Sequence, residues 1–492
     1  MKRISEIITP NEIKTWKNTD IITISAGTGR GKSHFIKNIL YAFAEKNNKK
    51  ILMLIHRVNC VDQFRKEIMR DNKTHVIDIK SYQSLENGNG KFIDFADYEY
   101  IVCDEFHYFL SDAAFNITTD ISLDMILSKT NITRILMSAT GDYMKRYINN
   151  IKRLDTRDYE LPQDFSFIEQ LTFYNKDDTL EKFIEQAIKQ NDKGIFFIQS
   201  VEKAFGLYNK YKEYCLFNCS KTNGYYKHVD KERISNMLES EKFNENILIT
   251  TTCMDAGVNI NDIDVKHIVL DVKDTGVLIQ CLGRRRIQNE EDKIHIYIKN
   301  INNRQLGGME TQLKQKIKKA DFLLEHTVKE YIQKYPRSND YSNIVYDEIV
   351  NEDNKATKRI NELMYYKCKF DLGDIAEMKL FGEYGYCKYL QNIFKYNRLY
   401  RLISEDHKKD ELERYLESTA GDIMPTLKDR KELIEKIDVK SNGRRLKKIN
   451  NLNGALEEME ISFRIVEFET SRTVGGKKKK FKNAWKVEKL IS

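Results

Sequence analysis

Residues 26–33 read AGTGRGKS and follow the apolar run IITI at residues 21–24. This order predicts a buried strand that leads through a tight glycine turn into the N-terminus of a helix. Backbone N–H groups of such a turn surround phosphate oxygens, and the helix dipole favours their negative charge. We therefore predict a phosphate-binding loop for a nucleoside triphosphate, with ATP and Mg²⁺ as the expected cofactors.

Individual positions of this loop have expected roles. Lys32 is expected to reach the β- and γ-phosphates, and the Ser33 hydroxyl is expected to bind Mg²⁺. Alanine rather than glycine stands at the first position, which the turn tolerates. The residues expected to bind ATP through the loop are Ala26, Gly27, Thr28, Gly29, Arg30, Gly31, Lys32 and Ser33.

Composition predicts a soluble protein of two or three domains, because the 492 residues are 41% hydrophobic and 32% charged. No apolar run is as long as a membrane span, and the first residues, MKRISE, do not form a secretory signal. We therefore expect a cytoplasmic protein with no membrane partner. The net charge of +8 is concentrated at one end, since residues 440–492 hold 14 Lys or Arg against 6 Asp or Glu.

Apolar runs separated by helical spacing indicate the fold. The runs at 51–55, 100–103 and 134–137 are typical of buried parallel strands. The same alternation starts again near Leu171 and continues to residue 298. We expect an α/β protein with two consecutive parallel-sheet domains, residues 1–165 and 166–301.

The remainder, residues 302–492, is expected to be a mostly helical accessory region that ends in a small basic β tail. Residues 310–335, 355–370 and 387–402 have helical spacing of apolar residues, and 460–470 alternate as a strand does. Within the second predicted domain, residues 280–286 are expected to form the start of a helix.

A pair of carboxylates follows the apolar run at 100–103, in the order Asp104-Glu105-Phe106-His107. Hydrolysis of a triphosphate needs an acid that holds Mg²⁺ and a base that orients water. We assign these roles to Asp104 and Glu105, because both stand at the end of a strand in the sheet that carries the phosphate loop.

In this order the motifs resemble those of superfamily-two helicases and translocases, in the DEAD/DEAH-type branch with an Asp-Glu-x-His box. The resemblance covers roughly residues 20–300 and implies that both domains are RecA-like. It implies that His107, Ser138 and Thr140 couple hydrolysis to domain movement. It also implies that Asp255 and Gly257 bind ATP in the closed state.

The segment QCLGRRR at 280–286 resembles the last motif of that family, in which an arginine reaches the γ-phosphate across the domain cleft. The family's final arginine would fall at position 287, which is Ile287 here. Arg286 is the favoured candidate, while Arg284 or a shifted helix register stay open. Gln280, Arg284 and Arg286 join Glu105 as the expected catalytic residues.

Nucleic acid is the expected partner, with DNA favoured over RNA and a protein that loads the enzyme as a further possibility. Segments that resemble the nucleic-acid motifs of the family supply some candidates. Others lie in the basic tail, where lysines alternate with rings that could stack on bases. The candidates are Arg57, Gln63, Ser81, Gln83, Thr252, Lys478, Lys480 and Trp485.

The sequence thus favours an ATP-dependent helicase or translocase that acts in replication of a mobile element or in defence against one. An RNA helicase and a duplex translocase that does not unwind remain alternatives within this class. A small-molecule kinase with a phosphate loop would leave the second domain unexplained. A binding module that uses ATP only as a clamp would not need Glu105.

Overall fold

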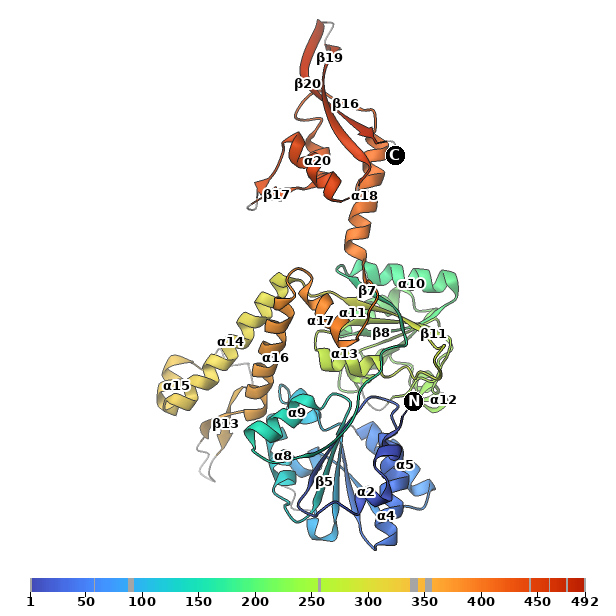
Figure 1. Ribbon diagram of the computed structural model, residues 1–492, viewed down its shortest axis with the longest axis vertical. Coiled ribbons are helices and arrows are strands. Elements are labelled where there is room, and N and C mark those ends of the chain that lie inside the picture. The colour runs from blue at the N-terminus through green and yellow to red at the C-terminus, as the bar shows by residue number, and fades with distance from the viewer. Residues whose placement is uncertain are drawn as a thin grey trace. The chain divides into compact units, whose positions relative to one another are not determined.

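The computed structural model describes residues 2–56, 58–86, 93–254, 258–336, 344–349, 356–441, 444–459, 461–474 and 477–490. The chain forms two compact units, one of residues 1–173 with 177–400 and one of residues 174–176 with 401–492 (Figure 1). The region that we expected as one piece, 302–492, is therefore divided after residue 400.

The first α/β domain is built on a parallel sheet of order β3-β2-β4-β5-β1-β6. Because neighbouring strands run the same way, Ala26, Asp104 and Ser138 all end their strands at one edge. The strands are β1 (Ile21–Ala26), β2 (Ile51–Ile55), β3 (Ile77–Ser81), β4 (Tyr100–Asp104), β5 (Thr133–Ser138) and β6 (Arg157–Leu161).

Helices cover both faces of this sheet, because alternate strand residues enter two different cores. Met53 lies in the core under the first group of helices, whereas Leu52 and Leu54 lie in the core under the second. The first group is α1 (Ile4–Ile7), α2 (Pro10–Ile13), α3 (Lys32–His34), η1 (Phe35–Leu40), α4 (Tyr41–Lys46) and α5 (Val58–Arg70). The second is α6 (Gln83–Glu86), η2 (Phe95–Asp97), α7 (Tyr108–Ser111), α8 (Thr119–Leu127), α9 (Asp142–Arg146) and η3 (Tyr147–Ile151).

The second α/β domain has the strand order β7-β12-β11-β8-β10-β9, and the pairs from β12 to β9 are parallel. Its strands are β7 (Ile168–Tyr174), β8 (Lys193–Ile198), β9 (Cys215–Asn218), β10 (Ile247–Thr250), β11 (Val265–Asp271) and β12 (Ile294–Lys299). Its helices are α10 (Asp178–Gln190), α11 (Val201–Lys210), η4 (Gly224–His228), α12 (Lys231–Ser240), η5 (Thr252–Met254) and α13 (Thr275–Leu282). The predicted fold class, two tandem parallel-sheet α/β domains, is confirmed.

A mostly helical region follows and packs on the first domain, since Ala320, Tyr331 and Leu363 belong to one of that domain's cores. Its elements are α14 (Asn303–Glu325), α15 (Val328–Lys334), β13 (Val345–Ile349), β14 (Ala356–Ile360), α16 (Glu362–Leu380) and α17 (Gly385–Ile393).

Three predicted helices of this region have different limits in the structure. The helix expected at 310–335 is two helices, because Thr327 caps a new one through a reciprocal bond with Glu330. The helix expected at 355–370 begins only at residue 362, after Asn361 caps it and strand β14 ends. The helix expected at 387–402 ends at residue 393.

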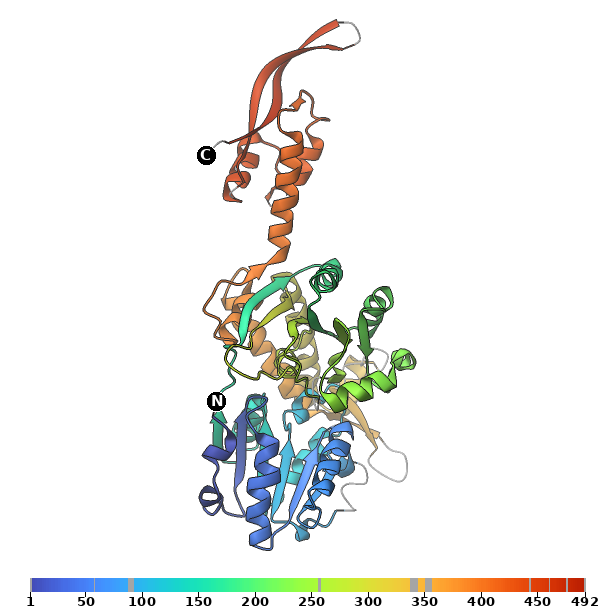
Figure 2. The ribbon, with the colours of Figure 1, turned by 90° about the vertical axis from the view of Figure 1, so that its right-hand side faces the viewer.

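The second unit contains a small sheet of order β16-β20-β19 that is covered by helices. Its longest strands, β19 and β20, form an antiparallel hairpin, so the predicted β tail is present (Figure 2). The elements are β15 (Arg401–Leu402), α18 (Ile403–Thr419), β16 (Ile423–Met424), α19 (Lys431–Ile437), β17 (Lys440–Ser441), β18 (Arg444–Arg445), α20 (Ile449–Glu458), β19 (Phe463–Val474) and β20 (Lys477–Lys489). No described helix of the chain is both long enough and apolar enough to span a membrane.

Trp485, which we expected to stack on a nucleic-acid base, lies in the core of the second unit. Its side chain is only 5% exposed and packs with Leu416, Leu452 and Val487. The guanidinium of Arg430 lies 4.5 Å from the ring centroid on one face. The expectation is therefore wrong for this residue, because no face of the indole is open to a base.

We expect Trp485→Ala to destabilise the second unit by about 3–5 kcal/mol, since the substitution removes a large buried ring. Hydrogen exchange of α20 and β19 would measure the loss. Trp485→Phe, which keeps a ring in the core, should retain most of the protection. Unchanged exchange in the alanine variant, with weaker binding of nucleic acid, would restore the stacking role.

Candidate active site

The glycine loop between β1 and α3 has the backbone that its sequence predicts. Gly29 and Gly31 have φ angles of 78° and 84°, in the left-handed region that favours glycine. Gly31 is the N-cap of the helix that starts with Lys32. The Lys32 ammonium donates to the carbonyl of Ala26 at 2.7 Å, inside the curve of the loop. The loop thus places a buried cation where phosphates are expected to bind.

Burial strongly affects the charges beside this loop. It lowers the pKa of Lys32, while the carboxylates of Glu105 and Asp104 act in the opposite direction. Burial and the neighbouring Glu105 raise the pKa of Asp104 to about 6. Burial would also raise the pKa of Glu105, but Lys32, His107 and Arg284 together lower it. The lowered pKa keeps the Glu105 carboxylate ionised, so that it can accept a hydrogen bond from a water molecule.

Glu105 occupies an unusual position at the end of β4. Its φ angle of 51° is left-handed, which a non-glycine residue rarely adopts. Its Oε2 atom is buried without a hydrogen-bond partner among the described residues, and His107 Nδ1 lies 3.4 Å from it. Such local strain and unsatisfied polarity are typical of functional sites.

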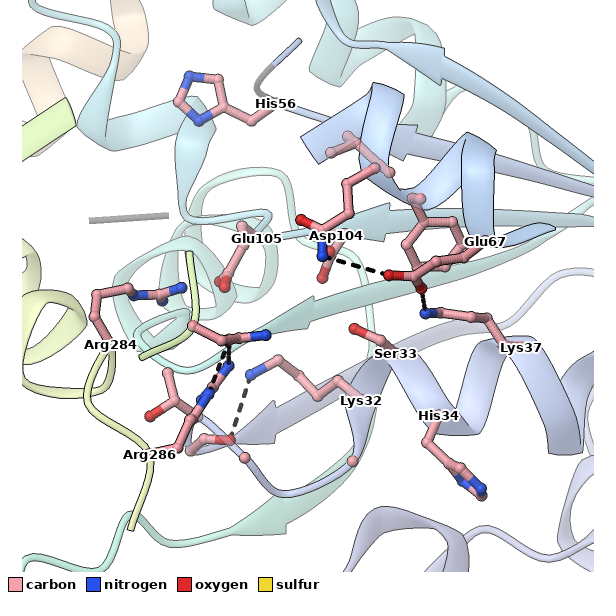
Figure 3. Close-up of a pocket in the computed structure, with 18 residues that line it drawn as sticks. Lys32, Ser33, His34, Lys37, His56, Glu67, Asp104, Glu105, Arg284 and Arg286 are labelled. Carbon is pink, nitrogen blue, oxygen red and sulfur yellow. Dashed lines mark hydrogen bonds and ion pairs between the residues drawn. The ribbon is translucent and has the colours of Figure 1, made fainter. Parts of the chain in front are cut away.

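A cavity of about 330 Å³ joins the loop, the two carboxylates and the second α/β domain (Figure 3). The second domain contributes Asn259, Arg284 and Arg286 to its lining. The predicted residues that line the cavity are Gly27, Thr28, Gly29, Gly31, Lys32, Ser33, Asp104, Glu105, Arg284 and Arg286, together with Gln63.

Other predicted ATP-binding residues lie elsewhere. Ala26 ends β1 and meets Lys32 through its carbonyl. The Arg30 side chain donates to the carbonyls of Lys2 and Pro162, each at 3.5 Å, rather than lining the cavity. Asp255 and Gly257 lie outside the described residues.

Gly283 brings the two domains together at the loop. A Cβ atom at Gly283 would lie 2.2 Å from Oγ1 of Thr28 and 2.6 Å from its Cγ2. Only glycine allows this approach, because real Cβ atoms do not come so close to neighbouring atoms. The segment 280–286 does not open a helix as we predicted. Helix α13 begins at Thr275, after Asp274 caps it, and ends at Leu282.

The three consecutive arginines after α13 have different environments. Arg285 is buried and forms a two-point ion pair with Asp292, with both contacts 2.6 Å long, so it holds the domain together. Arg284 and Arg286 line the cavity, and Arg286 Nε donates to Asn259 Oδ1 at 2.9 Å. Burial beside Arg284 lowers the pKa of Arg286 to about 10. Both arginines therefore border the cavity in which the triphosphate is expected to bind.

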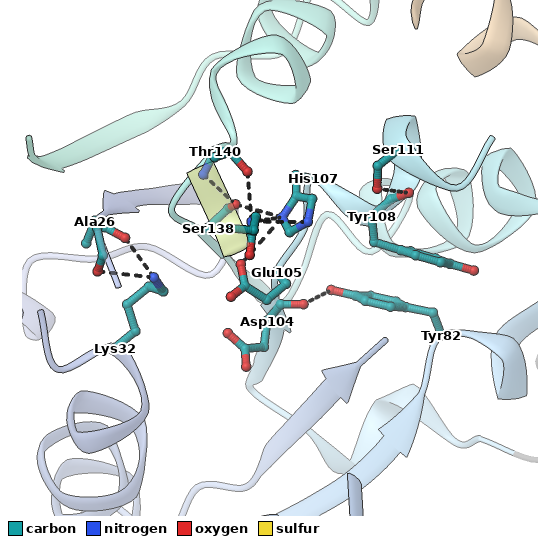
Figure 4. Close-up of polar contacts among 12 residues, drawn as sticks. Ala26, Lys32, Tyr82, Asp104, Glu105, His107, Tyr108, Ser111, Ser138 and Thr140 are labelled. Carbon is teal, nitrogen blue, oxygen red and sulfur yellow. Dashed lines mark hydrogen bonds and ion pairs between the residues drawn. The ribbon is translucent and has the colours of Figure 1, made fainter. Parts of the chain in front are cut away.

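A chain of hydrogen bonds connects Arg284 to His107, whose Nδ1 lies 3.4 Å from Glu105 Oε2. Arg284 Nη2 donates to Gln280 Oε1 at 3.2 Å, and Gln280 Nε2 donates to Thr140 Oγ1 at 2.9 Å. The Thr140 N–H donates to Ser138 Oγ at 3.0 Å, and His107 Nδ1 lies 2.9 Å from the same oxygen (Figure 4). The predicted coupling residues thus lie between the carboxylate of one domain and the arginines of the other.

The predicted nucleic-acid residues are scattered rather than gathered. Gln63 lines the cavity beside the loop. Ser81 Oγ accepts from the Ser84 N–H at 3.3 Å, and Gln83 Nε2 donates to the Tyr108 hydroxyl at 3.3 Å. Arg57 lies outside the described residues. Lys478 and Lys480 lie on β20 in the second unit and are exposed.

Thr252 lines a second cavity, of about 970 Å³, that is enclosed by both α/β domains and by α14 and α16. His107, Thr140 and Gln280 also line this cavity, which shares Gly27 and His56 with the cavity at the phosphate loop.

Helix α16 contacts both domains, which the sequence did not indicate. Its Glu362 accepts from the Tyr147 hydroxyl of the first domain at 2.8 Å. Its Lys367 donates at 3.0 Å to Asp274, the residue that caps α13 in the second domain. The sequence did not predict a role for Lys367, because nothing in the local pattern of residues 355–370 distinguishes it from a surface lysine. It also did not predict Asn259, which lines the first cavity.

Comparison with known proteins supports a helicase-like function. Residues 175–287, which include α13 and the three arginines, match the family described as helicase conserved C-terminal domain. No curated protein matches the chain.

Among solved structures, the chain is similar to S. cerevisiae Dbp5 bound to RNA and ADP BeF3, at 16% identity and a TM-score of 0.40, covering 57% of this chain and 79% of that one. It is similar to the Escherichia coli DEAH/RHA helicase HrpB at 12% identity and a TM-score of 0.42, covering 63% and 46%. It is similar to the DEAD-box helicase Mss116 bound to ssRNA and UDP-BeF at 19% identity and a TM-score of 0.45, covering 60% and 69%. These similarities are too distant to indicate a substrate.

We expect Gly283→Ala to lower ATP hydrolysis by about tenfold or more, because its Cβ would force the arginines away from the loop. ADP binding to the first domain should change little. Gly206→Ala on α11 is a matched control, since nothing lies within 4 Å of its Cβ position. Hydrolysis rates equal in both variants would contradict the close approach of the domains.

Proposed function

We propose that this protein is an ATP-dependent nucleic-acid helicase or translocase of the superfamily-two DEAD/DEAH type. The observation that carries the proposal is the shared cavity, in which Arg284 and Arg286 of the second domain face Lys32 and Glu105 of the first. A site made by two domains changes when its ligand changes, so hydrolysis can alter the distance between the domains.

Each residue in the proposed reaction has a role that its surroundings support. The loop N–H groups and Lys32 hold the phosphates, and ionised Glu105 orients the attacking water. Arg286 or Arg284 stabilises the charge that develops on the γ-phosphate. Gln280, Thr140, Ser138 and His107 transmit the state of the γ-phosphate between the domains.

Mg²⁺ fits the same site. The raised pKa of Asp104 reflects two adjacent buried carboxylates, a concentration of negative charge that a cation relieves. Ser33 and Asp104, which line one cavity, would hold the ion. When bound, Mg²⁺ would neutralise charge on the phosphates.

Nucleic acid is the proposed partner, with DNA favoured. The larger cavity borders the coupling residues, and the basic β20 strand lies in a separate unit. A motor that moves along any sequence grips backbone phosphates, for which lysines suffice. An RNA helicase or a duplex translocase that does not separate strands remains the alternative, and a role for a loading protein belongs to the same proposal.

The hypotheses of a kinase and of a binding module account for fewer features of the structure. A small-molecule kinase does not need arginines from a second sheet at the loop. A binding module gated by ATP does not need a strained, ionised glutamate beside it. We therefore favour the helicase or translocase over both of these alternatives.

We expect Glu105→Gln to reduce ATP hydrolysis by about 100-fold or more while ATP binding remains, because the variant keeps the shape of the side chain but loses the base. Steady-state hydrolysis and equilibrium binding of a fluorescent ATP analogue would separate the two effects. Glu202→Gln, at an exposed position of α11 in the second domain, is the control. Unchanged turnover in Glu105→Gln would contradict the assigned base.

Stimulation by nucleic acid tests the proposed class itself. Hydrolysis should rise when single-stranded DNA, duplex DNA or RNA is added, and the most effective polymer identifies the substrate. Phosphate transfer to a small acceptor, with no response to any nucleic acid, would replace the motor by a kinase.

A further inference from the structure

The β19–β20 hairpin extends beyond the small sheet to which it belongs (Figure 2). Strand β16 pairs with β20 only at Lys486 and Trp485, near the base of the hairpin. Beyond this point the two strands pair only with each other, from Thr470 opposite Phe481 to Val474 opposite Lys477. We call this outer part, residues 470–474 and 477–482, the ribbon.

Charge separates the ribbon from its base. The ribbon contains six Lys or Arg and no Asp or Glu. The base, residues 463–469 and 483–489, contains three basic residues and three acidic ones. Lysines of the base form ion pairs with acids of the second unit, Lys486 with Glu488 of the base at 3.2 Å and Lys489 with Glu417 of α18 at 2.6 Å. The excess positive charge of the hairpin therefore lies entirely on the ribbon.

The strand period places the ribbon lysines on both of its faces. Lys478, Lys480 and Lys482 alternate along one face of β20, and all three are exposed. Lys479 lies on the other face, directly opposite Arg472 of β19. Like charges opposite each other destabilise a hairpin. Among the described residues, Glu469 of the base forms an ion pair with one ribbon lysine, Lys480, at 2.7 Å. Folding of the hairpin does not account for this charge, but binding of a polyanion does.

The rings of the hairpin argue against a single strand as that polyanion. Single-stranded nucleic acids bind proteins by stacking bases on exposed aromatic side chains. Trp485 and Phe463 are buried, and Phe481 and Phe468 are half-buried. Within the described residues of the hairpin, no ring is fully exposed for stacking.

We propose that the ribbon enters the major groove of duplex DNA and binds the phosphates on both sides of it. A two-stranded ribbon fits the major groove of B-form DNA, which is about 12 Å wide. The groove of A-form RNA is too narrow and deep for such an element. Lysines on both faces of the ribbon can meet the two phosphate backbones that border the groove. The inference rests on the proposed function and names the duplex as the substrate class.

The test compares three variants of the full chain. The first is Lys478→Ala with Lys480→Ala and Lys482→Ala, and the second changes the same three lysines to Arg. The third is the control, Lys447→Ala with Lys486→Ala and Lys489→Ala, which removes the same charge from other parts of the unit. Fluorescence anisotropy measures their binding to a 20-base-pair duplex DNA, the corresponding RNA duplex and single-stranded DNA, at several salt concentrations without ATP.

We expect the ribbon alanine variant to weaken duplex DNA binding by about tenfold or more and to reduce the salt slope by about 2 to 3, the effect of three lost phosphate contacts. The arginine and control variants should bind as the unchanged chain does. Dimethyl sulfate should show guanine N7 protection in the major groove, and the ribbon alanine variant should lose it.

Two outcomes would overturn the proposal: equal losses in the ribbon and control variants, or equal losses on single-stranded DNA and duplex DNA without N7 protection. ATP hydrolysis without nucleic acid gives a separate readout. A chain that hydrolyses ATP but ignores the ribbon substitutions retains the proposed function and loses this inference. If the chain does not hydrolyse ATP but binds duplex DNA through the ribbon, the duplex-binding inference is retained and the proposed function is lost.

Discussion

The site depends on the contact between Gly283 and Thr28, where the second α/β domain touches the phosphate loop of the first. A Cβ atom at Gly283 would lie 2.2 Å from Thr28 Oγ1, so the approach is possible only for glycine. Gly283 comes directly after the end of α13, and the next residues, Arg284 and Arg286, line the same cavity as Lys32. Without this contact the cavity would be lined by the first domain alone, and the proposed coupling of hydrolysis to domain movement would have no structural basis.

Two sets of polar contacts join the same two domains. Inside the cleft, Gln280 connects Arg284 to Thr140, and His107 lies beside Glu105. Outside it, α16 contacts Tyr147 of the first domain and Asp274 of the second, so the cap of α13 depends on a helix from the accessory region. The accessory helices therefore contact the residue that caps α13 and form part of the wall of the larger cavity.

The sequence predicted the features that are local along the chain. The phosphate loop and the Asp104-Glu105 pair each follow an apolar strand, so their place at the sheet edge follows from strand direction. It did not predict features that depend on distant residues. The burial of Trp485 depends on α18–α20, the Lys367–Asp274 contact joins residues 93 positions apart, and the start of α13 depends on the Asp274 cap. Strand β14 was missed because residues 355–370 have helical spacing of apolar residues, and because the strand forms only by pairing with β13.

The affinity for a triphosphate relative to a diphosphate tests most directly whether both domains form one site. Isothermal titration calorimetry measures this ratio with ADP and a non-hydrolysable ATP analogue. The proteins compared are the unchanged chain and the double variant Arg284→Ala with Arg286→Ala. We predict that the double variant binds ADP normally and loses affinity for the triphosphate by about tenfold or more, since charge-assisted contacts to the γ-phosphate disappear. Equal affinities of both proteins for the triphosphate would show that the arginines do not reach it, and the account would fail.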